Sequence, residues 1–338
     1  MKQYILGIES SCDETSVAIY DYSNNKLLSN IVSSQIATHT KFGGVMPEIA
    51  SRLHIEKINY VIQESIETAG INYDDLSAIA VTSGPGLIGA LHVGLQAAKT
   101  LALALNKPLI SVHHLVGHIY ANSYEQELKF PCLALVVSGG HTEIVYMKEE
   151  YSFEIIGTTQ DDAIGEAYDK VARVMGLGYP GGPKIDKVSK EGNPTYVLPK
   201  PHTEGKYDVS YSGLKTAVIN LIHKNKQRGE EINVPDMCAS FQTRAVGMIV
   251  DKLVASLDEY KVKQVIVAGG VAANSYLRKE IVEKVHAKYP EVEVGLPPLW
   301  CCGDNAAMIA KAAAFLYKNK KFSDLSLGVN PNWSIDEL

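Results

Sequence analysis

The chain has 338 residues, of which 46% are hydrophobic and 21% charged, a composition that is ordinary for a globular protein. At about 150 residues per domain, this length predicts two domains, each large enough to bury a full core. The 32 basic and 38 acidic side chains give a formal net charge of −6, which argues against a histone-like coating protein but allows a local basic site.

Strands and helices alternate along the chain, which predicts an α/β protein. The predicted strands are short apolar runs bounded by polar turns, and they cover residues 4–8, 17–20, 76–82, 108–112, 132–137, 143–147 and 264–268. The predicted helices have apolar residues near helical spacing and cover residues 47–69, 87–105 and 304–317. His92, Gln96 and Lys99 interrupt the helix over 87–105, so we expect a buried helix there and no membrane span.

The strand–turn–strand unit at the start of the chain occurs again near residues 132–147, which predicts a duplicated architecture. Five of the 14 prolines fall between residues 180 and 201, so we expect that stretch to be rich in loops.

The cysteines and the N-terminus favour a reducing, cytoplasmic location. Five cysteines, an odd number, stand at 12, 132, 238, 301 and 302 without CxxC spacing, so a disulfide framework is not expected. Adjacent Cys301 and Cys302 are expected to be buried thiols. Glu9 interrupts the apolar run near the N-terminus, so no signal peptide is expected.

Three turns rich in glycine or hydroxyl groups directly follow apolar strands, at residues 9–16, 138–142 and 269–274. Backbone N–H groups in such turns can approach an anion closely, and the third turn leads into a helix N-terminus. Each turn alone is more often structural, and neither a Walker A motif nor GxGxxG is present. The combination is typical of the phosphate and adenosine elements of the actin, sugar kinase and Hsp70 fold.

His114 and His118 are four residues apart, so on a helix both imidazoles share one face and could bind one metal ion. Two polar helix residues without a ligand remain the alternative. Leu115 stands where the HExxH motif of metalloproteases needs glutamate, so that mechanism lacks its general base. Asp304, at the start of the last predicted helix, is either an N-cap or a third, anionic metal ligand.

Other polar residues of the turns are candidates for chemistry. Asp13 and Glu14 could orient a nucleotide or act as a base, although turn acids are usually only solvated. His141 follows a glycine pair in a turn that could bind phosphate, so it is a candidate for the chemistry, although a lone histidine is more often structural or solvated. Asp169 and Asp186 flank a second glycine pair, and alone their positions say little.

Ten motifs stand in order along almost the whole chain, among them HHLVGH at 113–118 and VSGGHT at 137–142. Together they closely resemble the TsaD family of tRNA N6-adenosine threonylcarbamoyltransferases. His141 after Ser-Gly-Gly is similar to the bacterial and organellar branch, whereas Ala306 departs from many relatives, which carry glycine there. The motifs occupy residues 8–16, 43–48, 83–87, 113–118, 137–142, 165–170, 179–183, 210–215, 268–274 and 304–309.

The resemblance implies a fold and a domain division. The fold is the two-domain actin-like, sugar kinase and Hsp70 (ASKHA) fold, with duplicated sheet-and-helix domains around a nucleotide cleft. We expect residues 1–118 with 300–338 to form the first subdomain, and 119–299 the second, with a loop-rich insertion near 180–215.

The resemblance also implies the reaction. A threonylcarbamoyl group would pass from threonylcarbamoyl-AMP to N6 of adenosine 37 in tRNAs that read codons beginning with A, and AMP would leave. His114, His118 and Asp304 would hold one Fe²⁺ or Zn²⁺ ion per subunit. The adenylate would be lined by Val136, Val137, Ser138, Gly139, Gly140, Asp169, Gly182, Asp186 and Asn274.

By the same resemblance, Asp13, Glu14 and His141 would be the polar groups closest to the chemistry. The expected partners are the tRNA anticodon stem-loop, a paralogue called TsaB and an ATPase called TsaE, with no membrane, and the chain alone could form a homodimer. Basic strips at 223–228 and 318–321 are candidate tRNA contacts, although such runs are most often solvated faces.

Three other functions compete with this interpretation. A small-molecule kinase or carbamoyltransferase of the same fold would share the nucleotide turns without needing the histidine pair. A metalloprotease is disfavoured by the missing HExxH motif. A non-catalytic scaffold would not need His114, His118 and Asp304 together.

Overall fold

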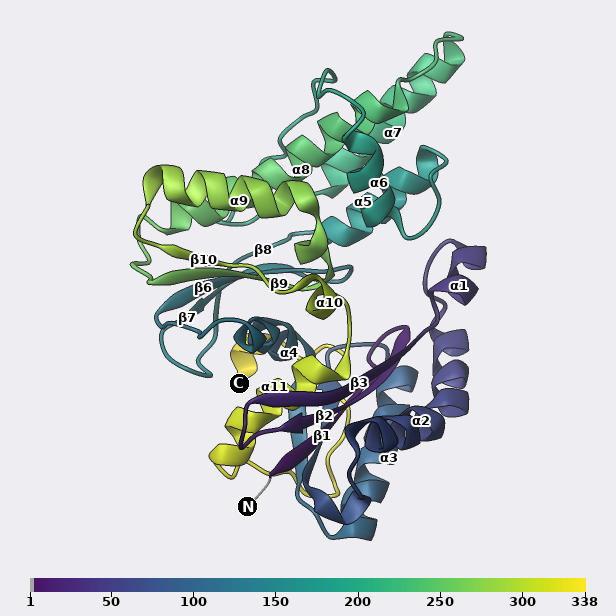
Figure 1. Ribbon diagram of the computed structural model, residues 1–338. Helices are drawn as coiled ribbons and strands as arrows, with labels where there is room; N and C mark the ends of the chain where they lie inside the picture. The colour runs from purple at the N-terminus through teal and green to yellow at the C-terminus, as the bar shows by residue number, and fades with distance from the viewer. Residues whose placement is uncertain (1–2) are drawn as a thin grey trace. The chain divides into compact units, whose positions relative to one another are not determined.

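The computed structural model describes residues 3–338, and the chain forms two compact units. Unit 1 comprises Met1–Glu127 and Pro298–Leu338, and unit 2 comprises Leu128–Pro297. The chain therefore leaves unit 1, builds unit 2 and returns to unit 1 with its last segment (Figure 1). The expected domain boundaries at residues 118 and 300 stay a prediction.

Unit 1 is built on a five-stranded mixed sheet with the strand order β3-β2-β1-β4-β5. The first three strands are antiparallel neighbours in a meander, and β1 pairs parallel to β4, which pairs parallel to β5. The strands are β1 (Tyr4–Glu9), β2 (Glu14–Asp21), β3 (Lys26–Ser34), β4 (Leu76–Gly84) and β5 (Leu109–His113).

Helices cover both faces of this sheet, which explains why every residue of β1 is buried. Helices α2 and α3 pack on one face, where Leu6 and Ile8 meet Ile62 and Leu95 in one hydrophobic cluster. Helix α11 packs against β1 and β2 and against α4. The helices of unit 1 are α1 (Ile36–His39), α2 (Pro47–Ala69), α3 (Ile88–Leu105), α4 (His114–Ala121), α10 (Leu299–Cys302) and α11 (Ala306–Lys318).

Unit 2 repeats the topology of unit 1. Its sheet has the order β10-β9-β6-β7-β8, with an antiparallel meander of β6, β7 and β8 and parallel pairing of β6 with β9 and of β9 with β10. The predicted duplication is thus confirmed by strand order and direction. The strands are β6 (Cys132–Val137), β7 (Thr142–Met147), β8 (Glu154–Thr158), β9 (Gln264–Ala268) and β10 (Glu293–Gly295).

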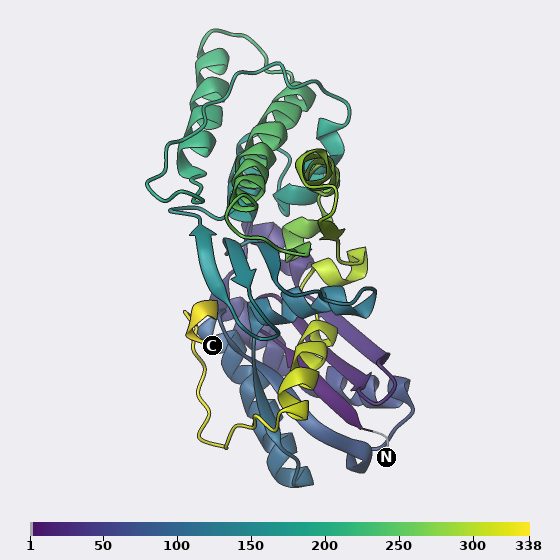
Figure 2. The same ribbon diagram turned by 90° about the vertical axis from the view of Figure 1, so that its left-hand side faces the viewer.

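The helices of unit 2 lie on one side of its sheet, where α8 packs against α6 and α9, and α5 against α6 and α7 (Figure 2). They are α5 (Ile164–Val174), α6 (Gly181–Ser189), α7 (Ser212–Gln227), α8 (Val234–Ser256) and α9 (Ser275–Lys288).

The expected loop-rich stretch at 180–201 is partly wrong, because its first half is the helix α6. Pro180 is the N-cap of α6, and Pro183 lies in its first turn. The first N–H groups of a helix have no partner within the helix, so proline is tolerated there. These prolines mark a helix start, and the loop runs only from residue 190 to 211.

The apolar helix α3 is buried on one face only, which corrects the expectation of a buried helix. Ala90, Leu91 and Leu95 lie in the core, whereas Ile88 and Leu103 are 60% and 69% exposed. Among the described residues α3 is long and apolar enough to cross a membrane by length and composition alone, a test that core helices of soluble proteins also pass.

Candidate metal centre and nucleotide pocket

Helix α4 carries the two candidate histidines directly after strand β5. His113 caps this helix, because its Nδ1 accepts a hydrogen bond from the Leu115 N–H at 3.2 Å and its Nε2 lies 3.0 Å from the Trp333 carbonyl oxygen. His114 and His118 follow on one face of the helix, with ring centroids 4.7 Å apart. The predicted shared face is therefore confirmed.

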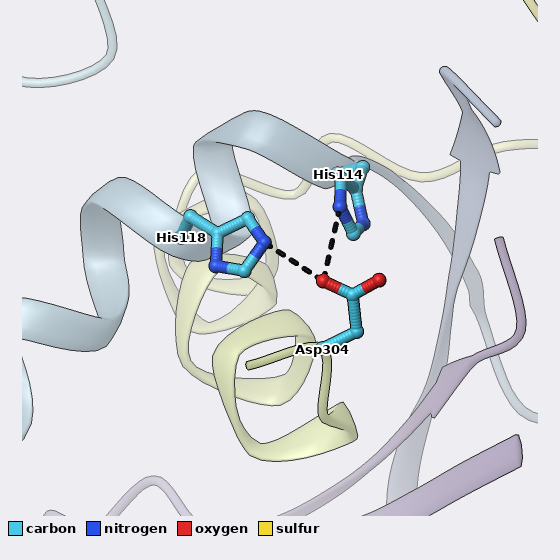
Figure 3. Close-up of side chains that lie close together, drawn as sticks. All are labelled: His114, His118 and Asp304. Carbon is cyan, nitrogen blue, oxygen red and sulfur yellow. Dashed lines mark hydrogen bonds and ion pairs between the residues drawn. The ribbon is translucent and has the colours of Figure 1, made fainter. Parts of the chain in front are cut away.

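Asp304, in the segment between α10 and α11, lies beside the two histidines. Its Oδ1 lies 3.1 Å from Nε2 of His118 and 3.5 Å from Nε2 of His114 (Figure 3). Helices α4 and α11 pack closely at Gly117, where an added Cβ would lie 2.8 Å from Cδ1 of Ile309. The three ligand atoms lie within 4.8 Å of one another, so these residues can bind a metal ion.

The alternative role of Asp304 as a helix cap is wrong. Helix α11 begins at Ala306, and its N-cap is Asn305, whose side chain accepts a hydrogen bond from the Met308 N–H at 3.2 Å. Asp304 therefore does not cap α11, and its carboxylate points toward His114 and His118 (Figure 3).

The chemistry of the donor set fits a transition metal. Two imidazole nitrogens and one carboxylate oxygen suit Zn²⁺ or Fe²⁺ and leave coordination positions for substrate or water. Nδ1 of His118 is buried without a hydrogen-bond partner among residues 3–338, and His118 is 1% exposed. The His118 ring is positioned by packing around Nδ1 and by the contact of Nε2 with Asp304, and it presents Nε2 to the same carboxylate oxygen as His114.

Charge strongly perturbs this site. Burial alone would lower the pKa of His114, but the carboxylates of Glu9 and Asp304 raise it to about 9. Burial alone would raise the pKa of Glu9, but the His114 charge and its hydrogen bond hold that pKa below its ordinary value. In the metal-free protein His114 is therefore a cation between two carboxylates.

Asp304 and Asp13 both lie near enough to Glu14 for their charges to act on it. Burial, then the charges of Asp304 and Asp13, raise the pKa of Glu14 to about 10, so its carboxyl is protonated at neutral pH in the metal-free protein. Asp13 is 7% exposed, and its Oδ2 has no hydrogen-bond partner within the described residues. This turn therefore adds two carboxyl groups to unit 1 beside the candidate metal centre.

Unit 2 contains a separate pocket of about 290 Å³, near the lower limit for small-molecule sites. Five of its lining residues were predicted from sequence: Gly139, Asp169, Gly182, Asp186 and Asn274. The lining residues that the sequence analysis missed are Gly165, Tyr168, Pro180, Pro183, Gly270, Val271 and Ala273.

Hydrogen bonds fix the polar residues of this pocket. Asp169 accepts from the Gly181 N–H at 2.6 Å, and Asp186 accepts from the Ser275 hydroxyl at 2.9 Å. Asn274 caps α9 by accepting from the Leu277 N–H at 2.9 Å. Burial raises the pKa of Asp169 above its ordinary value.

The turn between β6 and β7 holds the remaining predicted residues. Val136 and Val137 are fully buried in β6 and do not line the pocket. The Ser138 hydroxyl accepts from the N–H groups of Gly140 and His141 at 3.3 and 3.0 Å and so fixes the turn. His141 is half-buried, and its part in the chemistry stays a prediction.

Comparison with known proteins identifies relatives over nearly the full length. The family model described as "TsaD: tRNA N6-adenosine threonylcarbamoyltransferase" matches residues 26–311. A protein of that name from Geobacillus kaustophilus is 56% identical over 330 residues, 97% of this chain and 96% of the relative. Another of that name from Listeria monocytogenes serotype 4b is 53% identical over 335 residues, 99% of this chain and 97% of the relative.

Solved structures of low sequence identity share the fold and confirm the predicted ASKHA class. T. kodakarensis HypF superposes with a TM-score of 0.61 at 15% identity, over 94% of this chain and 48% of HypF. Component A of (R)-2-hydroxyglutaryl-CoA dehydratase from Acidaminococcus fermentans superposes with a TM-score of 0.55 at 13% identity, over 94% of this chain and 99% of component A.

Proposed function

This chain belongs to the TsaD family of tRNA N6-adenosine threonylcarbamoyltransferases, and we propose how its residues divide the work of that reaction. The enzyme is an acyltransferase that forms threonylcarbamoyladenosine (t6A) in tRNA. The observation that carries the proposal is the convergence of His114, His118 and Asp304 in unit 1.

The reaction forms a bond between N6 of adenosine 37 and the carbamoyl carbon of threonylcarbamoyl-AMP. The bond between that carbon and the phosphate oxygen breaks, AMP leaves, and N6 loses one proton. The phosphate is already a good leaving group, so the protein mainly has to place the amine against the carbon. Adenosine 37 lies in a single-stranded loop, where a base can be reached at modest cost.

His114, His118 and Asp304 would hold one Fe²⁺ or Zn²⁺ ion. When bound, the metal supplies a Lewis acid that polarises a carbonyl or phosphoryl oxygen. Asp13 and Glu14 belong to the same unit as this group, and we assign Glu14 to orienting the acyl donor and Asp13 to accepting the N6 proton. We assign His141 to contacting the acyl donor, and this assignment rests on the resemblance to the TsaD family alone.

The pocket of unit 2 would bind the adenylate part of the donor. Asp169 and Asp186 offer carboxylate oxygens that suit sugar hydroxyl groups, and Asn274 stands at the N-terminus of α9. Gly139, in the glycine turn after β6, lines this pocket, so we place the phosphate against that turn.

The groove between α2 and α3 would receive the paralogue TsaB. This groove of about 800 Å³ is lined by uncharged side chains except for the imidazole of His92, and its lining residue Ile55 is 64% exposed. Interface cores are depleted in charged residues, so this face fits a helix of a folded partner. Size-exclusion chromatography of Ile55→Glu with the paralogue should show loss of the complex.

The tRNA would contact the basic strips at 223–228, near the end of α7, and 318–321, which begins at the last residue of α11. Phosphate contacts make binding salt-dependent, so neutralising a contributing strip lowers the salt slope. We place the protein in the cytoplasm, since all five cysteines are free thiols.

Reconstitution tests the proposed function. The protein, its two expected partners, unmodified tRNA and threonylcarbamoyl-AMP are incubated, and t6A is measured by mass spectrometry of the digested nucleosides. We expect t6A at position 37 with the wild type and a loss of at least about 100-fold with His114→Ala, because losing a ligand should cost more than losing a group that only supports one, which costs about 10- to 100-fold. Absence of t6A with all components active would refute the proposal.

A further inference from the structure

A fully buried carboxylate stands behind the candidate metal centre. Glu9, the last residue of β1, is 0% exposed. Burying an ionised carboxylate is unfavourable unless partners compensate for the lost hydration. β1 otherwise contributes Leu6 and Ile8 to a hydrophobic core, so an apolar side chain would satisfy packing at the end of this strand. A carboxylate in this position therefore indicates a specific role.

Three donors from three different segments surround Glu9. The Ser11 N–H donates to Oε1 at 2.6 Å, and the Thr82 hydroxyl donates to Oε2 at 2.6 Å. Nδ1 of His114 lies 3.0 Å from the same Oε2. An ionised carboxylate only accepts hydrogen bonds, so the His114 contact requires the proton on Nδ1.

The proton on Nδ1 decides what the other ring nitrogen can do. A neutral imidazole has one N–H and one lone pair, so a proton on Nδ1 leaves the lone pair on Nε2 for the metal. Nε2 of His114 is the atom that faces Asp304, at 3.5 Å. The Ser11 hydroxyl also lies 3.2 Å from Nδ1, but a hydroxyl can donate or accept and fixes neither tautomer.

The two histidines differ in this respect. Nδ1 of His118 has no hydrogen-bond partner within the part of the chain that the structure describes. The charged partner of His118 is Asp304, which lies at Nε2, whereas Glu9 contacts His114 at Nδ1, the nitrogen that faces away from Asp304.

We propose that Glu9 is a positioning residue that fixes the Nε2-binding tautomer of His114 and thereby sets the metal affinity of the site. This inference rests on the proposed metal centre. Such carboxylate–histidine–metal arrangements contribute about 10- to 100-fold to metal affinity.

Glu9→Gln is the most direct variant because it keeps the shape and removes the charge. The Ser11 N–H still needs an acceptor, so the amide oxygen faces it and the NH2 group faces His114. The amide then donates to Nδ1, which moves the lone pair to Nδ1 and the proton to Nε2. We expect the Zn²⁺ affinity, measured against a chromophoric chelator, to fall about 10- to 100-fold.

Ser10→Ala is the matched control in the same turn. This variant loses a buried hydrogen bond, 2.9 Å long, from the Ser10 hydroxyl to the Ala90 carbonyl oxygen of α3. We expect its Zn²⁺ affinity to stay within about 3-fold of wild type, so that general loosening of the turn is separated from the role of Glu9. An equal loss in both variants would refute the positioning role.

A spectroscopic measurement on the wild type needs no variant to fold. In zinc-loaded protein with 15N-labelled histidine, His114 should show a protonated Nδ1 whose proton is shifted downfield by a carboxylate acceptor. Ser10→Ala should keep that resonance, and Glu9→Gln should lose it. Zinc binding by wild type without such a resonance, or equal affinity in Glu9→Gln, overturns the inference but not the metal centre, whereas no zinc binding by wild type overturns both.

Discussion

Replacing Asn274 should destabilise unit 2 by an amount that can be divided between two hydrogen bonds. The Asn274 Oδ1 caps α9 by accepting from the Leu277 N–H at 2.9 Å, and its Nδ2 donates to Oε1 of Gln242 at 2.7 Å. Asn274 is 8% exposed, so solvent replaces neither bond well. Removing an N-cap costs about 1 kcal/mol, and losing a buried hydrogen bond costs about 1 kcal/mol.

Asn274→Ala should therefore lower the free energy of unfolding by about 2 kcal/mol. Asn274→Ser keeps a capping oxygen and loses only the amide donor, so we expect it to lower the free energy of unfolding by about 1 kcal/mol. Gln242 gains no further penalty, because its Oε1 also accepts from the Tyr168 hydroxyl at 3.3 Å. The difference in unfolding free energy between the two variants therefore measures the contribution of the helix cap.

Urea unfolding followed by circular dichroism measures both losses, and hydrogen exchange of α9 peptides assigns them to unit 2. Equal losses for Ala and Ser would show that the cap contributes nothing. Losses below about 0.5 kcal/mol for both variants would refute the reasoning from these contacts, because that is the usual range for exposed surface changes.

Three further predictions concern a glycine, a ligand and a lysine. Gly269→Ala should cost about 2 kcal/mol or more, because φ is +93° and the new Cβ would lie 2.4 Å from a β6 carbonyl oxygen, whereas Gly270→Ala, with open space around it, should stay near wild type in thermal unfolding. His118→Ala should abolish stoichiometric metal binding in elemental analysis, and retention of a full equivalent would exclude it as a ligand. Burial lowers the pKa of Lys311 to about 8, so between about pH 8 and 10 the unfolded chain binds more protons and stability should rise with pH. Lys311→Met should flatten that rise in urea melts at several pH values, whereas the exposed Lys318→Met should leave it unchanged.

Local signals made parts of the fold predictable. Helix α2 runs from Pro47 to Ala69 as expected, because proline marks its first turn and Gly70 ends it in a left-handed conformation at φ 66°. The histidine pair was equally local, since spacing along one helix places both rings on one face.

Features set by distant contacts escaped sequence analysis. Whether Asp304 or Asn305 caps α11 depends on the backbone between α10 and α11, which two adjacent polar residues do not reveal. The role of Glu9 depends on its hydrogen bonds with Thr82 and His114, which lie far away in the sequence, so the sequence alone did not indicate it. The pocket wall formed by Tyr168 on α5 was missed for the same reason.

The most direct test of the metal centre is a crystal structure of the purified protein with anomalous data collected at the iron and zinc absorption edges. The account predicts one anomalous peak bonded to Nε2 of His114, Nε2 of His118 and Oδ1 of Asp304, at about 2.0–2.2 Å from each. A fully loaded, active enzyme with its metal peak elsewhere, or with no peak at these three atoms, would contradict it.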